Sequence, residues 1–373
     1  MPAAVPPPMN LQPGEQLDPK LQKFVQILTE AKRLNSSDLH LAPASPVMLR
    51  VDGALVPMQG MDFKPFEIDE LLRVMLDNTQ LAELEKNGEI DFAYSVPGFS
   101  RLRINAFRQR GTYAIALRIL SFEVPDVNKI GLPQSVINLA DKKRGLVLVT
   151  GATGSGKSTT LAALISKIAK TYAKTIITLE DPIEYLHRHG KGIVLQREIG
   201  YDSLSYANAL RAALRQDPDV ILVGEMRDLE TINTAVTAAE TGHLVFSTLH
   251  TNSAASTIDR VIDVFPPHQQ QQIKIQLASV LQGVIAQQLL PMEGSGGRVA
   301  AFEVMLANPA IANLIREGKA FQIPSTIQTS KKEGMITMDD SIYNLYMKGV
   351  ISSETAISYS HDPVGMQQKV SFY

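Results

Sequence analysis

The sequence has no cysteine and no tryptophan among its 373 residues. A chain without cysteine forms no disulfide, has no thiol nucleophile and builds no Cys-ligated zinc site. It also carries little net charge, only -2 at neutral pH. The overall electrostatics therefore favour neither nucleic acid nor an acidic membrane, and we expect no direct nucleic-acid partner.

Long hydrophobic runs are also missing. No apolar stretch is long enough to span a bilayer, and the N-terminus has no basic segment followed by a hydrophobic one. The hydrophobic share of 45% and the charged share of 20% are those of a soluble globular protein. We therefore expect a cytoplasmic chain that associates with a membrane only through partners.

The length predicts two folded units. Residues 1–18 are rich in proline and indicate a flexible arm, and residues 121–133, with Pro125 and Pro133, are typical of a linker. Between them, the periodicity of apolar residues predicts a small mixed α/β domain over 19–120, with a hairpin turn at Asp52-Gly53. A helix is expected over 19–34, and a helical pattern returns over 66–84. The expected strands are 39–41, 47–51, 55–56, 91–95, 102–106 and 113–117.

Strands and helices alternate in the second domain, residues 134–373, which predicts a parallel sheet covered on both faces. A ligand is then expected at the carboxyl ends of the strands. An apolar stripe indicates a further helix over 269–290, and residues 302–373 are expected to be mostly helical. The expected strands are 146–149, 175–179, 220–223 and 244–247, and the expected helices between them are 161–170, 207–214 and 230–240.

A glycine-rich segment, residues 151–158, directly follows the first of these strands and opens a helix. Its glycines let backbone N–H groups surround a phosphate, Lys157 reaches the β and γ oxygens, and the Ser158 hydroxyl is placed to hold Mg²⁺. The sequence therefore predicts that the chain binds ATP with Mg²⁺. The expected nucleotide-binding residues are Gly151, Thr153, Gly154, Ser155, Gly156, Lys157, Ser158 and Thr159.

Carboxylates follow two other strands. Gly224 and Glu225 follow the strand 220–223, and Glu225 is the leading catalytic candidate, because a carboxylate there can orient or deprotonate the attacking water. Gly224 stands where many phosphate-loop enzymes have a metal-binding aspartate, so the metal needs another anchor. Of Glu180, Asp181 and Glu184, the last is the leading candidate to face Mg²⁺ or water, and the alternative is that these acids cap a helix or pair with Arg227.

Two histidines flank the strand 244–247: His243 precedes it and His250 follows it. A histidine at a strand end is more often structural than catalytic, but the strand follows that of Glu225 in the chain, so both are kept as candidates. His187 and His189 lie in a polar stretch and are expected to be solvated.

These segments together resemble the secretion-type ring ATPases, with their Walker A loop, acidic box (177–184), Walker B motif (217–228) and histidine box (242–252). Within that superfamily, residues 310–319 resemble the signature of its PilT-type branch, the type IV pilus retraction ATPases. One position differs, because Ala312 stands where the branch usually has arginine. The pilus-extension and type II secretion relatives carry a tetracysteine zinc site, which this chain cannot build.

The resemblance implies a hexameric ring of subunits, each with a PAS-like N-terminal domain and a RecA-like ATPase domain. Arg103 and Arg118 match the family arginines that reach over the nucleotide from the N-terminal domain. The implied function is an ATP-hydrolysing motor that acts on an inner-membrane pilus platform protein, at the inner face of the cytoplasmic membrane, to drive pilin disassembly and twitching motility.

Alternatives remain at this stage. One alternative is an accessory retraction ATPase or a DNA-uptake ATPase of the same superfamily. Another is a nucleotide-dependent scaffold or regulator that does not hydrolyse ATP. In the segment 310–319, Ile311, Leu314 and Ile315 form an apolar stripe that favours docking of a helix on a partner, with ordinary core packing as the alternative.

Overall fold

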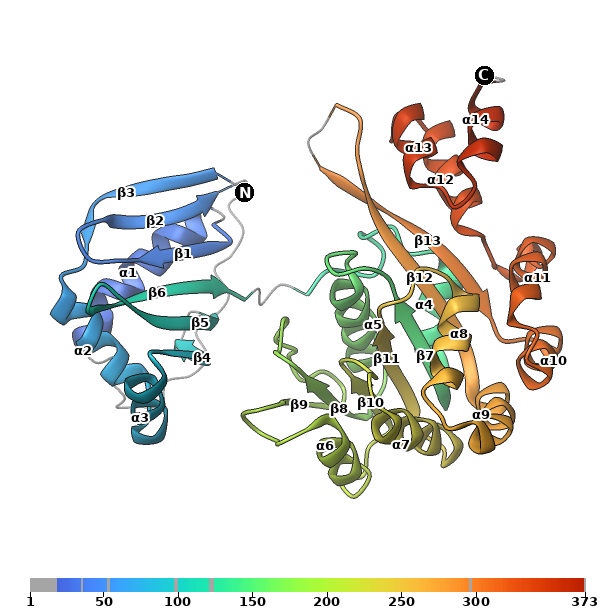
Figure 1. The fold of residues 1–373 in the computed structure, drawn as a ribbon, viewed down its shortest axis with the longest axis horizontal. Helices are drawn as coiled ribbons and strands as arrows, with labels where there is room; N and C mark the ends of the chain where they lie inside the picture. The colour runs from blue at the N-terminus through green and yellow to red at the C-terminus, as the bar shows by residue number, and fades with distance from the viewer. Residues whose placement is uncertain are drawn as a thin grey trace. The chain divides into compact units, whose positions relative to one another are not determined.

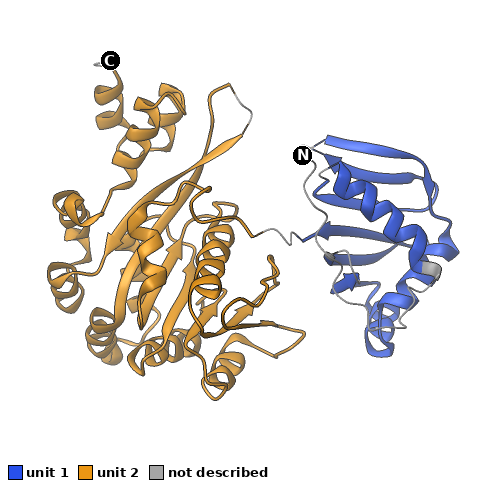
Figure 2. Ribbon diagram, turned by 180° about the vertical axis from the view of Figure 1, so that it is seen from behind, with its two compact units in different colours: residues 1–123 blue, residues 124–373 orange. Residues whose placement is uncertain are grey.

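The computed structural model describes residues 19–34, 36–51, 54–96, 100–120, 124–294 and 297–371. The chain divides into two compact units, residues 1–123 and 124–373 (Figure 2). The expected arm (1–18) and the expected turn at Asp52-Gly53 lie outside the described residues. Within the expected linker, Val127 and Leu132 are buried in the core of unit 2.

Unit 1 is built on a six-stranded antiparallel sheet, ordered β3-β2-β1-β6-β5-β4 (Figure 1). Along α1, the side chains of Phe24, Ile27 and Leu28 recur at helical spacing and pack against the sheet. Figures 1 and 2 show the helices on one side of the sheet. The elements are α1 (Pro19–Arg33), β1 (Asp38–Leu41), β2 (Pro46–Val51), β3 (Ala54–Asp62), α2 (Pro65–Met75), α3 (Asn78–Asn87), β4 (Glu89–Val96), β5 (Ser100–Gln109) and β6 (Thr112–Ile119).

The helical pattern expected over 66–84 forms two helices, α2 and α3. The break occurs because Leu76 is extended and Asp77 begins a new helix. The Asp77 side chain accepts hydrogen bonds from the backbone N–H groups of Thr79 and Gln80, both at 2.9 Å. The helical pattern expected over 66–84 is confirmed, and the structure divides it into two helices.

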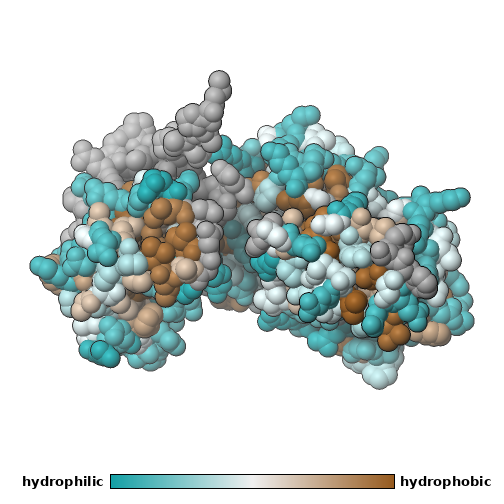
Figure 3. Space-filling model, turned by 90° about the horizontal axis from the view of Figure 1, so that it is seen from above, coloured by the Kyte–Doolittle hydropathy of each residue, from teal (hydrophilic) through white to brown (hydrophobic). Residues whose placement is uncertain are grey.

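The edge strand β3 is exposed along almost its whole length. Leu55 and Val56 are 49% and 40% exposed, and Figure 3 shows apolar side chains on the surface of the unit that contains this strand.

Unit 2 contains a seven-stranded sheet, ordered β13-β12-β7-β11-β10-β8-β9. All neighbours are parallel except β12 and β13, which are antiparallel. The strands are β7 (Gly145–Thr150), β8 (Thr175–Glu180), β9 (Ile193–Glu198), β10 (Val220–Val223), β11 (Leu244–Leu249), β12 (Leu281–Pro291) and β13 (Arg298–Leu306).

Helices cover both faces of this sheet, as the sequence predicted. Side chains alternate along β7, so that Leu146 and Leu148 enter one core while Val147 and Val149 enter the other. The first core contains α6 (Tyr206–Ala213), α7 (Leu229–Glu240), α8 (Ala254–Asp263) and α9 (Pro267–Val280), and the second contains α5 (Lys157–Thr171), α4 (Gln134–Ile137) and η1 (Asn138–Asp141). The predicted α/β class is confirmed.

The helix expected over 269–290 was partly wrong. It ends at Val280, and the chain continues as β12, which pairs with both β7 and β13. A short apolar run does not distinguish a buried strand from a buried helix, and here the strand pairing decides. The mostly helical region expected from residue 302 likewise begins with β13.

After β13 the chain is helical: α10 (Pro309–Glu317), η2 (Ala320–Gln322), α11 (Ile323–Thr329), η3 (Lys331–Glu333), α12 (Met338–Met347), α13 (Ser353–Tyr359) and α14 (Pro363–Ser371). Helices α12, α13 and α14 share a small core with residues of β12 and β13. Among the described residues, no helix has the length and apolar character needed to cross a membrane.

Candidate nucleotide-binding site

A cavity of about 550 Å³ lies at the carboxyl edge of the unit 2 sheet. It brings together segments that are far apart in the chain: the phosphate loop (residues 151–158), the acidic box after β8, the Walker B segment after β10 and the histidine box after β11. Its lining includes Thr153, Gly154, Gly156, Lys157, Ser158, Thr159, Glu180, Asp181, Glu184, His187, Tyr206, Glu225, Arg227, His250, Leu289 and Arg298.

The phosphate loop joins β7 to α5 through glycines with backbone conformations that other residues rarely adopt. Gly156 precedes α5 in the left-handed conformation (φ 91°). Gly151 has φ 142°, and a Cβ atom there would lie 2.3 Å from the carbonyl oxygen of Gln287. The loop thus leads into a helix N-terminus, whose free N–H groups and positive dipole end favour a bound phosphate.

Lys157 lies in the cavity at the start of α5. Its Nζ donates hydrogen bonds to the carbonyl oxygens of Gly151 and Ala152, at 2.8 and 2.9 Å. Burial lowers the pKa of Lys157, and the carboxylates of Glu184 and Glu225 oppose that shift. An anionic phosphate in the cavity would therefore stabilise the charged amine.

Glu225 is the second residue after β10 and is mostly buried. Its Oε2 is 2.8 Å from Nε of Arg227 and 3.7 Å from Nε2 of His250. Arg227 therefore pairs with Glu225, whereas the sequence offered a pairing of Arg227 with the acidic box as an alternative.

Of the three carboxylates of the acidic box, Glu180 has structural hydrogen bonds, whereas Asp181 and Glu184 are exposed. Glu180 Oε1 accepts hydrogen bonds from Thr178 Oγ1 at 2.6 Å and from Gln196 Nε2 at 3.0 Å. Burial raises the pKa of Glu180, and these hydrogen bonds oppose that shift. Glu184 is exposed and faces the cavity. Its neighbour Tyr185 lies with its hydroxyl 2.9 Å from Oγ1 of Thr159, which joins the acidic box to α5.

Position 224 has little room for a side chain. A Cβ atom on Gly224 would lie 2.7 Å from the Tyr206 hydroxyl oxygen and 3.1 Å from the carbonyl oxygen of Leu179. The Tyr206 phenol therefore lies where many phosphate-loop enzymes place an aspartate side chain. Burial raises the pKa of Tyr206, and the nearby Glu225 adds to the shift, so the phenol stays protonated and can donate a hydrogen bond.

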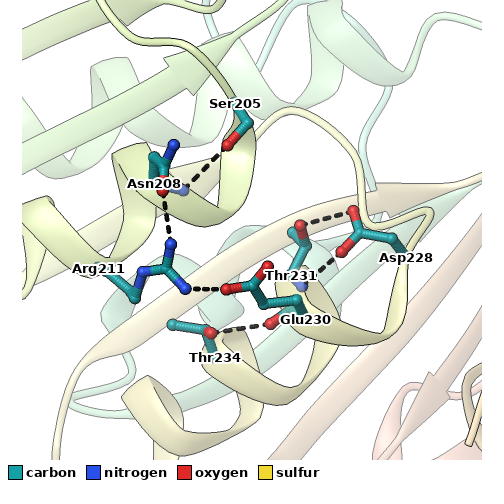
Figure 4. A network of polar contacts seen from close by, with 7 residues as sticks. All are labelled: Ser205, Asn208, Arg211, Asp228, Glu230, Thr231 and Thr234. Carbon is teal, nitrogen blue, oxygen red and sulfur yellow. Dashed lines mark hydrogen bonds and ion pairs between the residues drawn. The ribbon is translucent and has the colours of Figure 1, made fainter.

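A polar network joins α6, which begins with Tyr206, to α7, which follows the Glu225 segment (Figure 4). Ser205 caps α6 by accepting from the N–H of Asn208, and Asp228 caps α7 by accepting from the N–H and the hydroxyl of Thr231. Arg211 of α6 forms an ion pair with Glu230 of α7. This network holds the starts of both helices beside the cavity.

The four histidines discussed in the sequence analysis lie in different surroundings. His250 lies at the carboxyl end of β11 in the cavity, whereas His243 lies at the amino end, roughly 20 Å of strand away. The His243 Nδ1 atom is 2.9 Å from the carbonyl oxygen of Ala238, so the structure does not bring this candidate to the site. The expectation that His187 is solvated was wrong, because His187 lines the cavity and burial lowers its pKa to about 4. His189 is exposed, as expected.

Arg103 and Arg118 belong to unit 1, where they are paired neighbours on β5 and β6. The Nε atom of Arg118 forms an ion pair with Oδ1 of Asp38, at 2.8 Å. No pattern in the sequence pointed to Asp38. It lies beside Arg118 because β1 pairs antiparallel with β6, with Asp38 opposite Arg118.

The apolar stripe in 310–319 belongs to the core of unit 2. Ile311 and Ile315 of α10 are 0% and 1% exposed, and Leu314 packs against the same core. Ile311 and Ile315 thus follow the alternative of ordinary core packing, whereas Leu314 is only partly buried, so docking through Leu314 stays a prediction.

Sequence reasoning missed Gln287, which lies on β12 and is 3% exposed. Its side chain contacts the phosphate loop and α5. It also missed Leu289 of β12 and Arg298 of β13, which line the cavity. The available signal was the polar pair Gln287-Gln288 inside an apolar run, but that run had been interpreted as a helix stripe.

A parallel sheet covered on both faces, with a phosphate loop and a carboxylate at its carboxyl edge, defines a nucleotide-binding P-loop protein with a RecA-like domain. Residues 15–357 match the family of type II/IV secretion system proteins, and the chain belongs to this family.

The similarity to individual relatives extends over nearly the whole chain. The chain is 47% identical over 333 residues to the type IV pilus retraction ATPase PilT of Pseudomonas aeruginosa, covering 89% of this chain and 96% of that protein. It is 44% identical over 328 residues to a twitching motility protein of Neisseria gonorrhoeae, covering 88% and 87%. A crystal structure of the pilus retraction motor PilT with bound ADP has a TM-score of 0.86 and 48% identity, covering 95% of this chain and 100% of that chain.

Proposed function

We propose that this chain is an ATP-hydrolysing motor that powers retraction of type IV pili, and thereby pilin disassembly and twitching motility. The observation that carries the proposal is the shared cavity in which Lys157 of the phosphate loop and the carboxylate Glu225 both lie. The similarity to pilus retraction ATPases over nearly the whole chain supports pilus retraction as the process that this cavity drives.

In the proposed reaction, ATP and water give ADP and phosphate. Lys157 and the N-terminus of α5 bind the phosphates, and Glu225 orients the attacking water and accepts its proton. His250 is a neighbour of the same carboxylate, with its Nε2 3.7 Å from Oε2 of Glu225. The ion pair with Arg227 engages Oε2 of Glu225, so Oε1 is the oxygen that accepts the proton.

Mg²⁺ fits the donors present, because Ser158 and Glu184 supply oxygen ligands and both line the cavity. When bound, the ion neutralises charge on the phosphates. Since Mg²⁺ usually takes one or two protein oxygens together with phosphate oxygens and water, these two side chains suffice.

The proposed assembly is a homohexameric ring that engages an inner-membrane platform protein at the pilus base, on the cytoplasmic side. In it, Arg103 and Arg118 approach the nucleotide when domains close, and their guanidinium groups stabilise charge on the transferred phosphoryl group. Replacing either arginine by alanine should then lower hydrolysis much more than nucleotide affinity. Equal losses, measured by phosphate release and by titration with a fluorescent ATP analogue, would contradict this role.

The proposed function is tested in piliated cells that lack this chain. Pilus retraction should be lost without the chain, return with the parental chain and stay lost with Lys157→Ala, which removes the charge that binds the phosphates. If the chain hydrolyses ATP but its loss leaves retraction intact, an accessory or DNA-uptake ATPase is the better description. If retraction returns with a variant that cannot hydrolyse ATP, the chain acts as a scaffold.

A further inference from the structure

We propose that Gln287 is a positioning residue that sets the shape of the phosphate loop, by holding the Ser155 carbonyl away from the space that phosphates occupy. This inference rests on the proposed function in one respect, that nucleotide binds at this loop. It assigns a role to β12, a strand more than a hundred residues from the loop in sequence.

The side-chain amide of Gln287 uses both of its ends. Its Nε2 donates a hydrogen bond to the carbonyl oxygen of Ser155 at 2.8 Å, and its Oε1 accepts one from Oγ1 of Thr160 at 2.8 Å. The amide is buried, so neither partner has water as a ready substitute. One side chain thus joins the loop to the first turn of α5.

The strand register explains why Gln287 reaches the loop. Ala286 pairs with Thr150, the last residue of β7, so Gln287 lies beside the point where the loop begins. On its other side, Gln287 pairs with Phe302 of β13. The position of the amide is therefore set by two neighbouring strands and not by the loop itself.

The loop glycines fit closely around this residue. A Cβ atom on Gly151 would lie 2.3 Å from the Gln287 carbonyl oxygen, and one on Gly156 would lie 2.7 Å from its Nε2. The glycines at both ends of the loop are therefore required by contact with Gln287 as well as by their backbone conformations.

The carbonyl contact has a direct consequence for phosphate binding. A loop surrounds an anion with its N–H groups only when its carbonyl groups point elsewhere. The donor of Gln287 gives the Ser155 carbonyl a partner on the sheet side, and this leaves the N–H side of the loop for the phosphate.

The chemistry also defines the side chain required. The site needs a donor for Ser155 and an acceptor for Thr160, and a neutral amide supplies both. Gln287→Glu keeps the shape but, when ionised, sets a carboxylate oxygen against the Ser155 carbonyl oxygen. Gln287→Met keeps the approximate volume and loses both hydrogen bonds.

The experiment measures ADP affinity for the full chain by calorimetry, with circular dichroism as the test of folding. We expect Gln287→Glu and Gln287→Met to weaken ADP binding by about tenfold or more. Thr160→Val should weaken it about threefold, and should add nothing when combined with Gln287→Met, because the shared hydrogen bond is already absent.

The matched control is Gln288→Glu. This residue is next on β12, and strand side chains alternate, so its side chain points to the other face of the sheet. Its ADP affinity should stay within twofold of the parental value.

A pH series tests whether protonation restores ADP binding to Gln287→Glu, because the introduced carboxyl group again has a donor and an acceptor once it is protonated. The affinity of Gln287→Glu relative to the parental chain should therefore recover as the pH falls towards about 5.

The outcomes separate this inference from the proposed function. If the parental chain does not bind ADP, the proposed function fails and the inference with it. If the parental chain binds ADP and the Gln287 variants bind equally well, or Gln288→Glu loses as much, only the inference is overturned. Should both Gln287 variants fail to fold, unchanged ADP affinity in Thr160→Val would overturn it.

Discussion

The amino ends and the carboxyl ends of the strands in the unit 2 sheet, called here its amino and carboxyl edges, carry similar side chains in different surroundings. At the amino edge, Asp219 accepts a hydrogen bond from the backbone N–H of Thr175 at 2.8 Å, and His243 contacts the end of α7. At the carboxyl edge, Glu225 and His250 face a cavity with Lys157. A carboxylate and a histidine occur at both edges, but only one pair lies beside the phosphate loop.

The difference shows that position in the sheet, more than residue type, decides what these groups can do. At the carboxyl edge, loops from several parallel strands converge on the N-terminus of α5, so charged groups meet around one space. At the amino edge, the same kinds of group hydrogen-bond the nearby backbone. The comparison predicts large catalytic effects at the carboxyl edge and mainly effects on stability at the amino edge.

The largest expected effect is at Glu225. Glu225→Gln keeps the shape of the side chain but removes the base, so ATP hydrolysis should fall about 100-fold or more while nucleotide binding is retained. Phosphate release and ATP titration on the same preparation measure the two quantities. Hydrolysis at the parental rate would remove Glu225 from the mechanism.

A smaller effect is expected at Gly224. Gly224→Ala brings a methyl group against the Tyr206 hydroxyl, and the displaced phenol or strand end should lower hydrolysis about tenfold. Tyr206→Phe removes the hydroxyl, so the double variant should recover part of the loss relative to Gly224→Ala alone. A double variant that is no better than Gly224→Ala would indicate that the Leu179 carbonyl, and not Tyr206, limits the space.

The two histidines test the comparison directly. His250→Gln should lower hydrolysis by a factor of about five, since it changes a neighbour of Glu225. His243→Gln should leave hydrolysis within about twofold and lower the thermal midpoint instead, because it disturbs a hydrogen bond to the end of α7. Steady-state kinetics and thermal melts of both variants provide the measurement, and reversed effects would contradict the distinction between the edges.

The smallest expected effect is the pH dependence due to His187. Burial holds the pKa of this residue at about 4 in the folded chain, below its usual 6.5. Between these pH values, the unfolded chain therefore binds more protons at His187 than the folded chain does. The contribution of His187 to the free energy of unfolding is complete above pH 6.5 and is lost as the pH falls towards 4.

In His187→Gln the side chain stays neutral. Between about pH 7 and pH 4, this pKa difference corresponds to about 3 kcal/mol, so the thermal midpoint of the parental chain should fall by about 6 °C or more relative to that of the variant. Melting curves at matched ionic strength measure this difference. Parallel curves would mean that His187 titrates normally in the folded chain.

Sequence reasoning succeeded where a function depends on neighbouring residues. The segment 151–158 contains the glycines, the lysine and the serine of a phosphate loop in one stretch, and the alternation of strands and helices predicted its place at a sheet edge. It failed where the period of the apolar pattern was ambiguous. Residues 281–291 form a strand because β7 and β13 pair with them, and no local feature of that run announces the pairing.

By itself, the sequence determined the fold class and predicted the phosphate loop and the leading acidic residue, because each depends on local spacing or on the order of elements along the chain. Only the tertiary structure decided that Gln287 supports the loop, that Tyr206 fills the space beside Gly224, and that His250 and not His243 lies in the cavity. These contacts depend on strand order and register, which join residues far apart in the chain.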